Sequence, residues 1–272
     1  MFLPRVSRLV STVLAWTLLF GSIGTFAQTR PVVSRLDAAE ARSFLWVGNS
    51  FFYYNNSMHG HVGGLSAAAT PGKALRGVSV TISGSGMDWH DMASYLRPDG
   101  IGRYSFVGKN EIKFNKPGSQ FDAVIMMDCS QCPIHPQLQT VFHETVKKNT
   151  EILKGQGIQP VLFMSWAYKD KPEMTQQLAE QYTLAGNANH ALVIPAGLAF
   201  SRAIAARPAL ELYQPDLRHP SLAGTYLAAS TVYGAVTGKS PVGNSYTAGL
   251  DRELAEFLQR TAWDTLQAYY RD

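Results

Sequence analysis

Charged side chains are scarce in this chain, and neither sign dominates. Only 16% of the 272 residues are Asp, Glu, Lys or Arg, whereas 46% are hydrophobic. This balance excludes an intrinsically disordered chain, which needs high net charge and few apolar residues. The formal net charge is +4, and Arg5 and Arg8 in the N-terminal segment supply two of those charges. The composition therefore gives no reason to expect a nucleic-acid partner.

Long apolar segments are absent after the N-terminus. The chain begins with a short basic stretch, followed by an apolar centre at residues 9–24. Small residues follow just before Gln28. The apolar centre is shorter than the roughly 20 residues that a membrane span needs, and the pattern is typical of a secretory signal peptide. We predict a signal peptide over residues 1–27 and one domain over residues 28–272. The protein would then be secreted or periplasmic, with no stable membrane span after processing; the alternative is an uncleaved N-terminal anchor.

Short apolar segments alternate with stretches of helical periodicity. The predicted strands lie at residues 44–47, 78–82, 123–127, 161–164 and 191–194. The predicted helices lie at residues 58–69, 89–96, 138–153, 174–185, 198–206, 222–236 and 250–269. Apolar strands without alternation are buried on both faces, so the order predicts a three-layer α/β/α domain with a central parallel sheet. Residues 103–115 interrupt this order, and the turn residues Gly108-Lys109-Asn110 predict a β-hairpin there.

Three residues that suit nucleophilic catalysis lie near opposite ends of the chain. Ser50 follows the first predicted strand, at the edge where open parallel sheets bind ligands. Asp216 and His219 are three residues apart just before a predicted helix, so both side chains can point to one site. The carboxylate would hold one imidazole nitrogen while the other faces Ser50. Each motif alone also fits an ordinary turn or helix cap, but together they predict a Ser-His-Asp triad.

The two motifs together resemble the SGNH, or GDSL-type, hydrolase superfamily. Its members carry a Gly-Asp-Ser block after the first strand, matched here by Gly48-Asn49-Ser50, and an Asp-x-x-His block near the C-terminus. The segments at residues 44–51, 164–168 and 216–229 are similar to a bacterial subfamily with a Gly-Asn-Ser-Phe block. The resemblance implies a flavodoxin-like fold and ester hydrolysis through an acyl-enzyme, with no cofactor.

The resemblance also implies donors for an oxyanion hole. The backbone N–H of Ser50 is one, and a second-block glycine supplies another, for which Gly84 is the better match and Gly86 the alternative. The third family block, Gly-x-Asn-Asp, is replaced at residues 128–133, so its asparagine donor is missing. Ser130 and Gln131 both carry a polar hydrogen at about the same place, and either can substitute for it.

Cys129 and Cys132 are the only cysteines and flank these two residues. Oxidised pairs persist outside the cytoplasm, so we expect a disulfide that closes this loop. A thiol redox pair is the competing interpretation. It is disfavoured because Pro133 follows at once, whereas a redox pair opens a helix.

The histidines give little reason to expect a metal. His59 and His61, with Asp88 and His90, are the candidate ligands. Side chains two positions apart on a helix point in different directions. We therefore expect no metal site.

Aromatic side chains at the ends of predicted elements suit stacking against sugar rings. The candidate substrate-binding residues are Tyr53, Tyr54, Trp89, Trp166 and Tyr168. The insertion at residues 97–120 is polar and basic, which disfavours the apolar groove of a lipase. We expect a short acyl ester, such as acetyl, on a small molecule or polysaccharide. The alternatives are a lipase or lysophospholipase-type esterase, and a catalytically silent glycan-binding protein on the same fold, because the third-block asparagine is missing.

Overall fold

A five-stranded parallel sheet forms the centre of the protein. The computed structural model describes residues 1, 29–37, 40–98, 100–115 and 120–271, so the expected signal peptide lies outside the described residues except for Met1. The strands are β1 (Ser43–Gly48), β2 (Arg76–Thr81), β5 (Ala123–Met126), β6 (Gln159–Phe163) and β7 (Leu192–Ile194). Their spatial order is β2-β1-β5-β6-β7, and every neighbouring pair is parallel. This is the flavodoxin-like order, in which the direction of winding reverses between β1 and β5.

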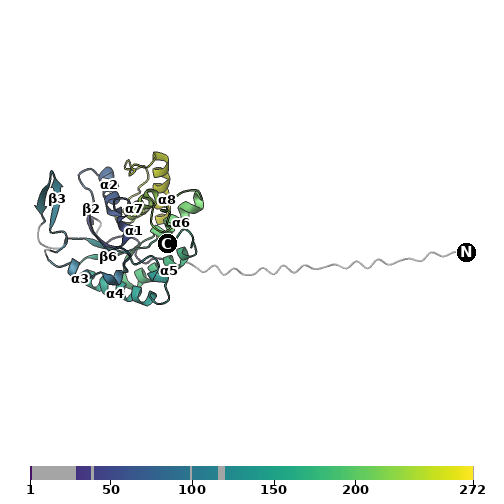
Figure 1. Ribbon diagram of the computed structural model, residues 1–272, viewed down its shortest axis with the longest axis horizontal. Helices are drawn as coiled ribbons and strands as arrows, with labels where there is room; N and C mark the ends of the chain where they lie inside the picture. Colours follow the sequence, from purple (N-terminus) through teal and green to yellow (C-terminus); the bar gives the residue numbers. More distant parts are fainter. Residues whose placement is uncertain (2–28, 38–39, 99, 116–119, 272) are drawn as a thin grey trace.

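Helices cover both faces of the sheet, as Figure 1 shows. One layer contains α2 (Met58–Ala69), α6 (Ala196–Ala206), α7 (Leu222–Thr237) and α8 (Arg252–Tyr270). The other contains α3 (Met92–Tyr95), α4 (Gln139–Lys154) and α5 (Met174–Asn189). Because both faces are covered, β5 and β7 are buried at every residue, which explains their unalternating apolar sequences. The predicted three-layer α/β/α class is confirmed.

The predicted elements occur in the predicted order, with two local differences. Residues 89–96 are not one helix: a 3₁₀ turn (Met87–Trp89) precedes α3, and extended backbone at His90 separates the two. The Asp91 side chain accepts from the Ser94 N–H at 3.1 Å, which begins α3 afresh. The second difference is an additional one-turn helix, α1 (Ser50–Tyr53), directly after β1.

The insertion between β2 and β5 contains the expected hairpin. β3 (Tyr104–Gly108) pairs antiparallel with β4 (Glu111–Phe114), and Lys109 and Asn110 at the turn both have positive φ. The insertion is basic, as expected, but its polar character is only partial. The hairpin within it also carries apolar residues that are exposed and, because of the strand register, most of them share one face.

No helix within the described residues is long and apolar enough to cross a membrane.

Candidate active site

The sequence positions Ser50 at the reversal point of the sheet. β1 ends at Gly48, and α1 begins at Ser50, which is 7% exposed. The Asn49 side-chain oxygen accepts from the Phe51 N–H at 3.2 Å and so caps α1. A Cβ at Gly48 would lie 2.9 Å from the Phe52 ring, closer than packed atoms allow, so the chain needs glycine at this bend.

His219 and Asp216 lie beside Ser50, on the loop that precedes α7. His219 Nε2 is 2.8 Å from Ser50 Oγ, and His219 Nδ1 forms a very short hydrogen bond with Asp216 Oδ2. Because an ionised carboxylate only accepts, Nδ1 carries the hydrogen and Nε2 is left to accept from the serine hydroxyl. The three predicted residues are thus brought into one hydrogen-bonded chain.

The Asp216 carboxylate is fixed by its own loop. Its Oδ1 accepts from the backbone N–H groups of Arg218 and His219, each at 3.0 Å. Leu217, which lies between Asp216 and Arg218, has a positive φ of 64°, and this bend turns both N–H groups towards the carboxylate. Desolvation opposes ionisation, but the hydrogen bonds from His219 and from these two N–H groups hold the pKa of Asp216 below its usual value.

Aromatic rings hold the imidazole on two sides. Tyr54 stacks on His219 at a centroid distance of 4.2 Å, and Phe51 meets its edge at 5.5 Å. Trp166 lies below, stacked on Phe51 at 4.7 Å, and its indole N–H donates to the Arg218 carbonyl at 3.0 Å. Trp166 has no exposed surface, so the expectation that it contacts substrate was wrong. It supports the histidine loop from within the core.

The second-block loop contains both candidate glycines, in different environments. Gly84 is exposed and has a φ of +71°, a conformation that favours glycine. Gly86 is buried, and a Cβ there would lie 2.4 Å from Asp88 Oδ1 and 3.1 Å from Asp128 Oδ1. Gly86 is therefore the position at which the second loop closely approaches the third.

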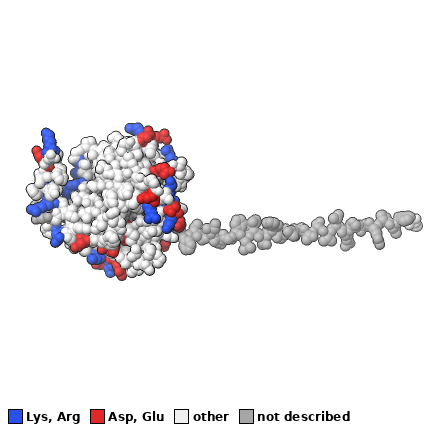
Figure 2. Space-filling model, in the orientation of Figure 1, with Lys and Arg blue, Asp and Glu red and all other residues white. Residues whose placement is uncertain are grey.

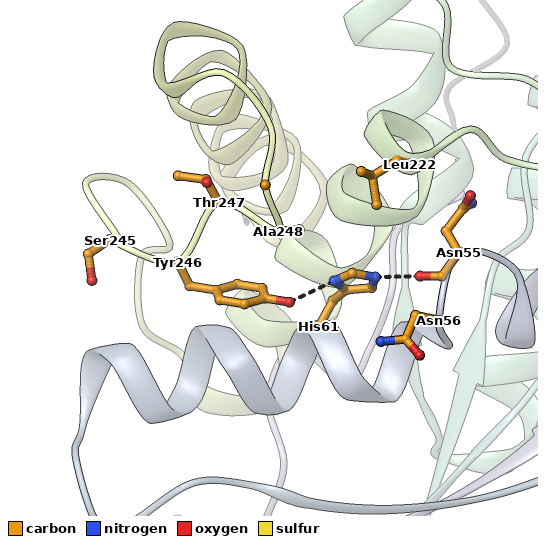
Figure 3. A pocket seen from close by; sticks show the side chains of 9 residues that line it. Asn55, Asn56, His61, Leu222, Ser245, Tyr246, Thr247 and Ala248 are labelled. Atoms are coloured by element: carbon orange, nitrogen blue, oxygen red, sulfur yellow. Dashed lines mark hydrogen bonds between the residues drawn. The ribbon is translucent and has the colours of Figure 1, made fainter.

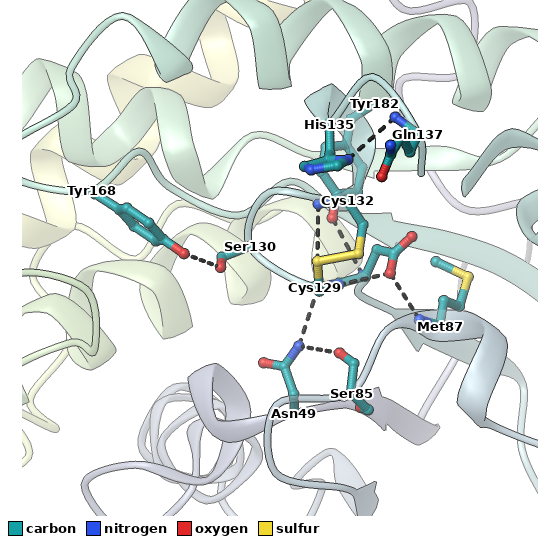
Figure 4. The surroundings of a disulfide bond; sticks show 11 residues. Asn49, Ser85, Met87, Cys129, Ser130, Cys132, His135, Gln137, Tyr168 and Tyr182 are labelled. Atoms are coloured by element: carbon teal, nitrogen blue, oxygen red, sulfur yellow. Dashed lines mark hydrogen bonds between the residues drawn. A yellow bond between two sulfur atoms is a disulfide. The ribbon is translucent and has the colours of Figure 1, made fainter. Parts of the chain in front are cut away.

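The third-block loop is closed by the Cys129–Cys132 disulfide, as predicted (Figure 4). Ser130 and Gln131 within it are half-buried. Ser130 Oγ lies 2.6 Å from the Tyr168 hydroxyl. The guanidinium of Arg218 lies over the Tyr168 ring at 4.8 Å, so Tyr168 connects this loop to the histidine loop.

Asp128 ties the second and third loops together. It is 3% exposed, and its Oδ1 accepts from the Met87 N–H at 2.8 Å and from the Cys129 N–H at 2.7 Å. Burial raises the pKa of Asp128 to about 6, and the nearby Asp88 acts in the same direction, against the two N–H bonds.

Asn49 joins the same two loops from the side of Ser50. Its amide nitrogen donates to the Ser85 carbonyl at 3.0 Å and to the Asp128 carbonyl at 3.2 Å (Figure 4). From the sequence, Asn49 was identified only as a departure from the family's aspartate, and this bridging contact was not expected. The available signal was chemical, because an amide has two donor hydrogens where a carboxylate has none.

Of the other expected binding residues, two are exposed and one is buried. Tyr53 is 37% exposed and Trp89 is 62% exposed, whereas Tyr168 is only 6% exposed. The Tyr53 hydroxyl donates to Ser83 Oγ at 3.1 Å, which brings that ring beside the second-block loop.

The candidate metal ligands do not converge on one point within the described residues. Both ring nitrogens of His61 are engaged, one with the Tyr246 hydroxyl at 2.9 Å and one with the Asn55 carbonyl at 2.7 Å (Figure 3). His90 is bonded to Ser85 Oγ at 3.0 Å and to the Tyr95 hydroxyl at 3.2 Å, and burial lowers its pKa.

An open pocket of about 660 Å³, which was not expected from the sequence, lies beside the residues that follow α1 (Figure 3). Asn55 and Asn56 line its wall with positive φ, a conformation that asparagine tolerates better than most residues do. The Asn55 amide donates to the Pro220 carbonyl at 2.8 Å, so this wall also holds the residue after His219.

Comparisons with known proteins reveal similarity in structure. No family model matches the chain, and no curated protein matches it. A DUF4886 family protein from Bacteroides uniformis is 16% identical with a TM-score of 0.58, covering 85% of this chain and 96% of that one. A putative SGNH hydrolase from Slackia heliotrinireducens is 23% identical with a TM-score of 0.52, covering 72% and 98%.

A catalytic mutant of Axe2, an acetylxylan esterase from Geobacillus stearothermophilus, is 15% identical with a TM-score of 0.52 and covers 74% of this chain and 96% of that one. Such low identities establish the fold and leave chemistry to be argued from the site. The chain has the SGNH-hydrolase fold that its motifs predicted.

Proposed function

We propose that this protein is a serine esterase that works through an acyl-enzyme. The observation that carries the proposal is the chain of hydrogen bonds from Ser50 Oγ through His219 to Asp216. Ser50 attacks the acyl carbon while His219 Nε2 takes its proton, and His219 then returns that proton to the oxygen of the leaving alcohol as the ester bond breaks. Water then loses a proton to the same nitrogen and attacks the acyl carbon. The bond from that carbon to Ser50 Oγ breaks, Ser50 Oγ takes the proton from His219 Nε2, and the acid is released. Asp216 holds the histidine in the tautomer that both steps need.

The oxyanion of each tetrahedral intermediate needs donors from three loops. Ser50 is the first residue of α1, so its N–H has no partner within that helix. Gly84, with Gly86 as the alternative, supplies the second N–H. Ser130 supplies the side-chain donor, with Gln131 as the alternative: if the Tyr168 hydroxyl donates to Ser130 Oγ, the Ser130 hydrogen is free to reach the oxyanion. Each such donor contributes about 3 kcal/mol to the transition state.

The proposed substrate is a short acyl ester, such as acetyl, on a carbohydrate. The exposed rings of Tyr53 and Trp89 suit the faces of sugars, and the pocket walled by Asn55 and Asn56 has no Asp, Glu, Lys or Arg in its lining. The acetylxylan esterase among the similar structures is consistent with this substrate class. We further propose that the protein is exported after cleavage before Gln28, which mass spectrometry of the N-terminus tests.

A lipase-type activity is the second candidate, and one cavity favours it. Phe200, Ile204 and Leu210 line a mainly apolar cavity of about 250 Å³ that also touches Tyr168. A site of that size suits a longer acyl chain.

A chain-length series distinguishes the two. Release of nitrophenol from p-nitrophenyl esters of two to sixteen carbons is measured beside acetate release from acetylated xylan and peptidoglycan fragments. The carbohydrate proposal predicts highest kcat/KM at acetyl together with acetate release from the sugars. A kcat/KM that rises with chain length, without acetate release, would replace it with the lipase candidate. If none of these esters releases nitrophenol or acetate, a binding protein on this fold would replace both candidates.

A further inference from the structure

The β3–β4 hairpin presents an apolar face that nothing in the described structure covers. Tyr104 pairs with Phe114 and Phe106 pairs with Ile112, so these four side chains lie on one face of the two strands. Their exposed fractions are 50% for Tyr104, 62% for Phe114, 76% for Phe106 and 48% for Ile112. Clustered exposure of large apolar side chains on a soluble domain marks an interaction surface.

The hairpin stands away from the body of the protein (Figure 1). Its base is closed by hydrogen bonds of Asn115, which joins the Arg103 carbonyl through its N–H and the Gly102 carbonyl through its side chain. The aromatic rings contact one another edge to face, with Tyr104 5.8 Å from Phe106 and 6.3 Å from Phe114. The apolar face is thus organised before anything binds to it.

Basic side chains lie at the base and at the turn of this face, whereas Lys113 pairs with Ser105 and so lies on the opposite face of the hairpin. Residues 103–115 contain Arg103, Lys109 and Lys113 against a single acid, Glu111. The Arg103 guanidinium lies 5.8 Å from the centre of the Phe114 ring, and Lys109 is at the turn. In Figure 2 the projecting arm carries blue side chains at its tip and towards its base, with little red.

These features disfavour a second copy of the chain as the partner. Two such hairpins placed face to face would bring like charges together at both rims. Pairing of strand edges is also hindered, because the register shifts between Phe106 and Gly108, and an irregularity of this kind twists an edge away from a partner.

We propose that the hairpin docks the protein on an anionic lipid surface. Aromatic and aliphatic side chains enter the boundary between headgroups and acyl chains, while Arg103 and Lys109 at the two ends of the face contact acidic headgroups. The unpaired N–H and C=O groups of a short hairpin remain in the hydrated headgroup layer, where water satisfies them. This docking is independent of the proposed ester hydrolysis.

Co-sedimentation with lipid vesicles tests the proposal. The chain from residue 28, which includes every helix and strand of the structure, avoids binding through the apolar leader. It is mixed with vesicles of phosphatidylcholine alone or with about one third phosphatidylglycerol. We expect at least about tenfold stronger partition onto the anionic vesicles, and weakening of this preference at high salt.

Two pairs of variants separate charge from apolar contact. Arg103→Gln with Lys109→Gln should weaken partition about thirtyfold, five- to sixfold for each basic residue. The matched control is Lys147→Gln with Lys148→Gln on α4, both exposed in the structure, which should change partition less than about twofold. Phe106→Ser with Phe114→Ser should abolish binding at low salt as well.

Circular dichroism and unchanged p-nitrophenyl acetate turnover, where the protein has it, verify that the variants fold. Leu184→Ser, at a 39% exposed position on α5, is the control for loss of an exposed apolar side chain. Equal partition onto both vesicle types, no sedimentation, or hairpin variants that bind like the parent would overturn the proposal. A dimer in solution that Phe106→Ser converts to monomer would assign the face to a second copy instead.

Discussion

Replacing Asn49 by aspartate is the sharpest test of how the site is held together. The amide nitrogen of Asn49 donates to two carbonyl groups, at Ser85 and Asp128, in a position that is only 5% exposed. In Asn49→Asp a carboxylate oxygen takes the place of the amide nitrogen and faces both carbonyl groups. Both hydrogen bonds are then lost, and oxygen atoms that carry full or partial negative charge lie next to one another. The cap of α1 survives, because the other side-chain oxygen can still accept from the Phe51 N–H.

The size of the effect follows from the two lost bonds. Each buried carbonyl left without a donor costs about 1–3 kcal/mol, so we expect a loss of roughly 3 kcal/mol in the free energy of unfolding. In a domain of this size that lowers Tm by about 6–12 °C. The two loops released by the change carry the proposed oxyanion donors, so kcat should fall by about a hundredfold with little change in KM.

Acid should partly reverse the defect. Protonation of the new carboxyl restores one O–H donor, and a buried carboxyl facing carbonyl groups holds its proton to higher pH than usual. The assay is the ratio of variant to parent kcat on p-nitrophenyl acetate from pH 5 to pH 8, which cancels the effects of His219 and Asp216. Asn49→Ala is the control, since it removes both donors and adds no titrating group.

The result that would refute this reasoning is specific. If Asn49→Asp retains parental kcat at pH 8, the amide does not hold the loops. If the ratio is the same at pH 5 as at pH 8, the defect does not arise from the missing donors. An aspartate works at this position only where the neighbouring loops present N–H groups to it, and here they present carbonyls.

Further predictions concern the triad, the oxyanion loops and pH. Ser50→Ala and His219→Ala should each lower ester turnover by at least about a thousandfold, and the double variant should be little worse, because the proton relay acts as a unit. Ser130→Ala should lower kcat by about ten- to a hundredfold, and an unchanged kcat would move the donor to Gln131. Reduction of the disulfide should lower kcat clearly but the free energy of unfolding only a little. Closing a loop with a sequence separation of 3 stabilises the folded state by about 2 kcal/mol or less. Burial raises the pKa of Asp128 to about 6, so the folded state keeps a proton that the unfolded state has lost, and stability should fall as pH rises from about 4 to about 6. The free energy of unfolding is measured by urea denaturation at each pH. Asp128→Asn, whose side-chain oxygen can keep both N–H bonds, should remove this decrease with pH, which amounts to roughly 3 kcal/mol or less.

The sheet and most helices could be predicted because their burial is encoded locally. β5 is apolar at four successive residues since both its faces are covered, and the bounds of α2 coincide with the predicted residues 58–69. The interrupted segment around His90 was not predictable in the same way. Its periodicity fits a helix, but the ring of His90 is held by Ser85 and Tyr95, each five residues away, which is not the spacing of side chains that meet along a helix.

The site was predictable to the extent that its residues are chemically distinctive. Ser50, Asp216 and His219 stand in recognisable spacings, and the structure brings them within hydrogen-bonding distance. Trp166 was misassigned because an aromatic residue at a strand end looks the same in sequence whether it faces solvent or core. The partners of Asn49 are 36 and 79 residues away in sequence, so its bridging contact follows from the fold alone.

The missing third-block asparagine does not leave the oxyanion loops loosely held. Four contacts hold the third loop. They are the disulfide within it, the Asp128 carboxylate with the Met87 N–H, the Asp128 carbonyl with the Asn49 amide, and the Ser130 hydroxyl with Tyr168. Preorganised donors stabilise a transition state because they need no reorganisation when charge develops, so rigidity here matters as much as the identity of the donor. The same rigidity would serve a binding protein, whereas proton transfer from the serine requires a contact such as that of Ser50 Oγ with His219 Nε2 at 2.8 Å. The proposed ester hydrolysis therefore rests on the triad, and the loops would determine how fast the reaction proceeds.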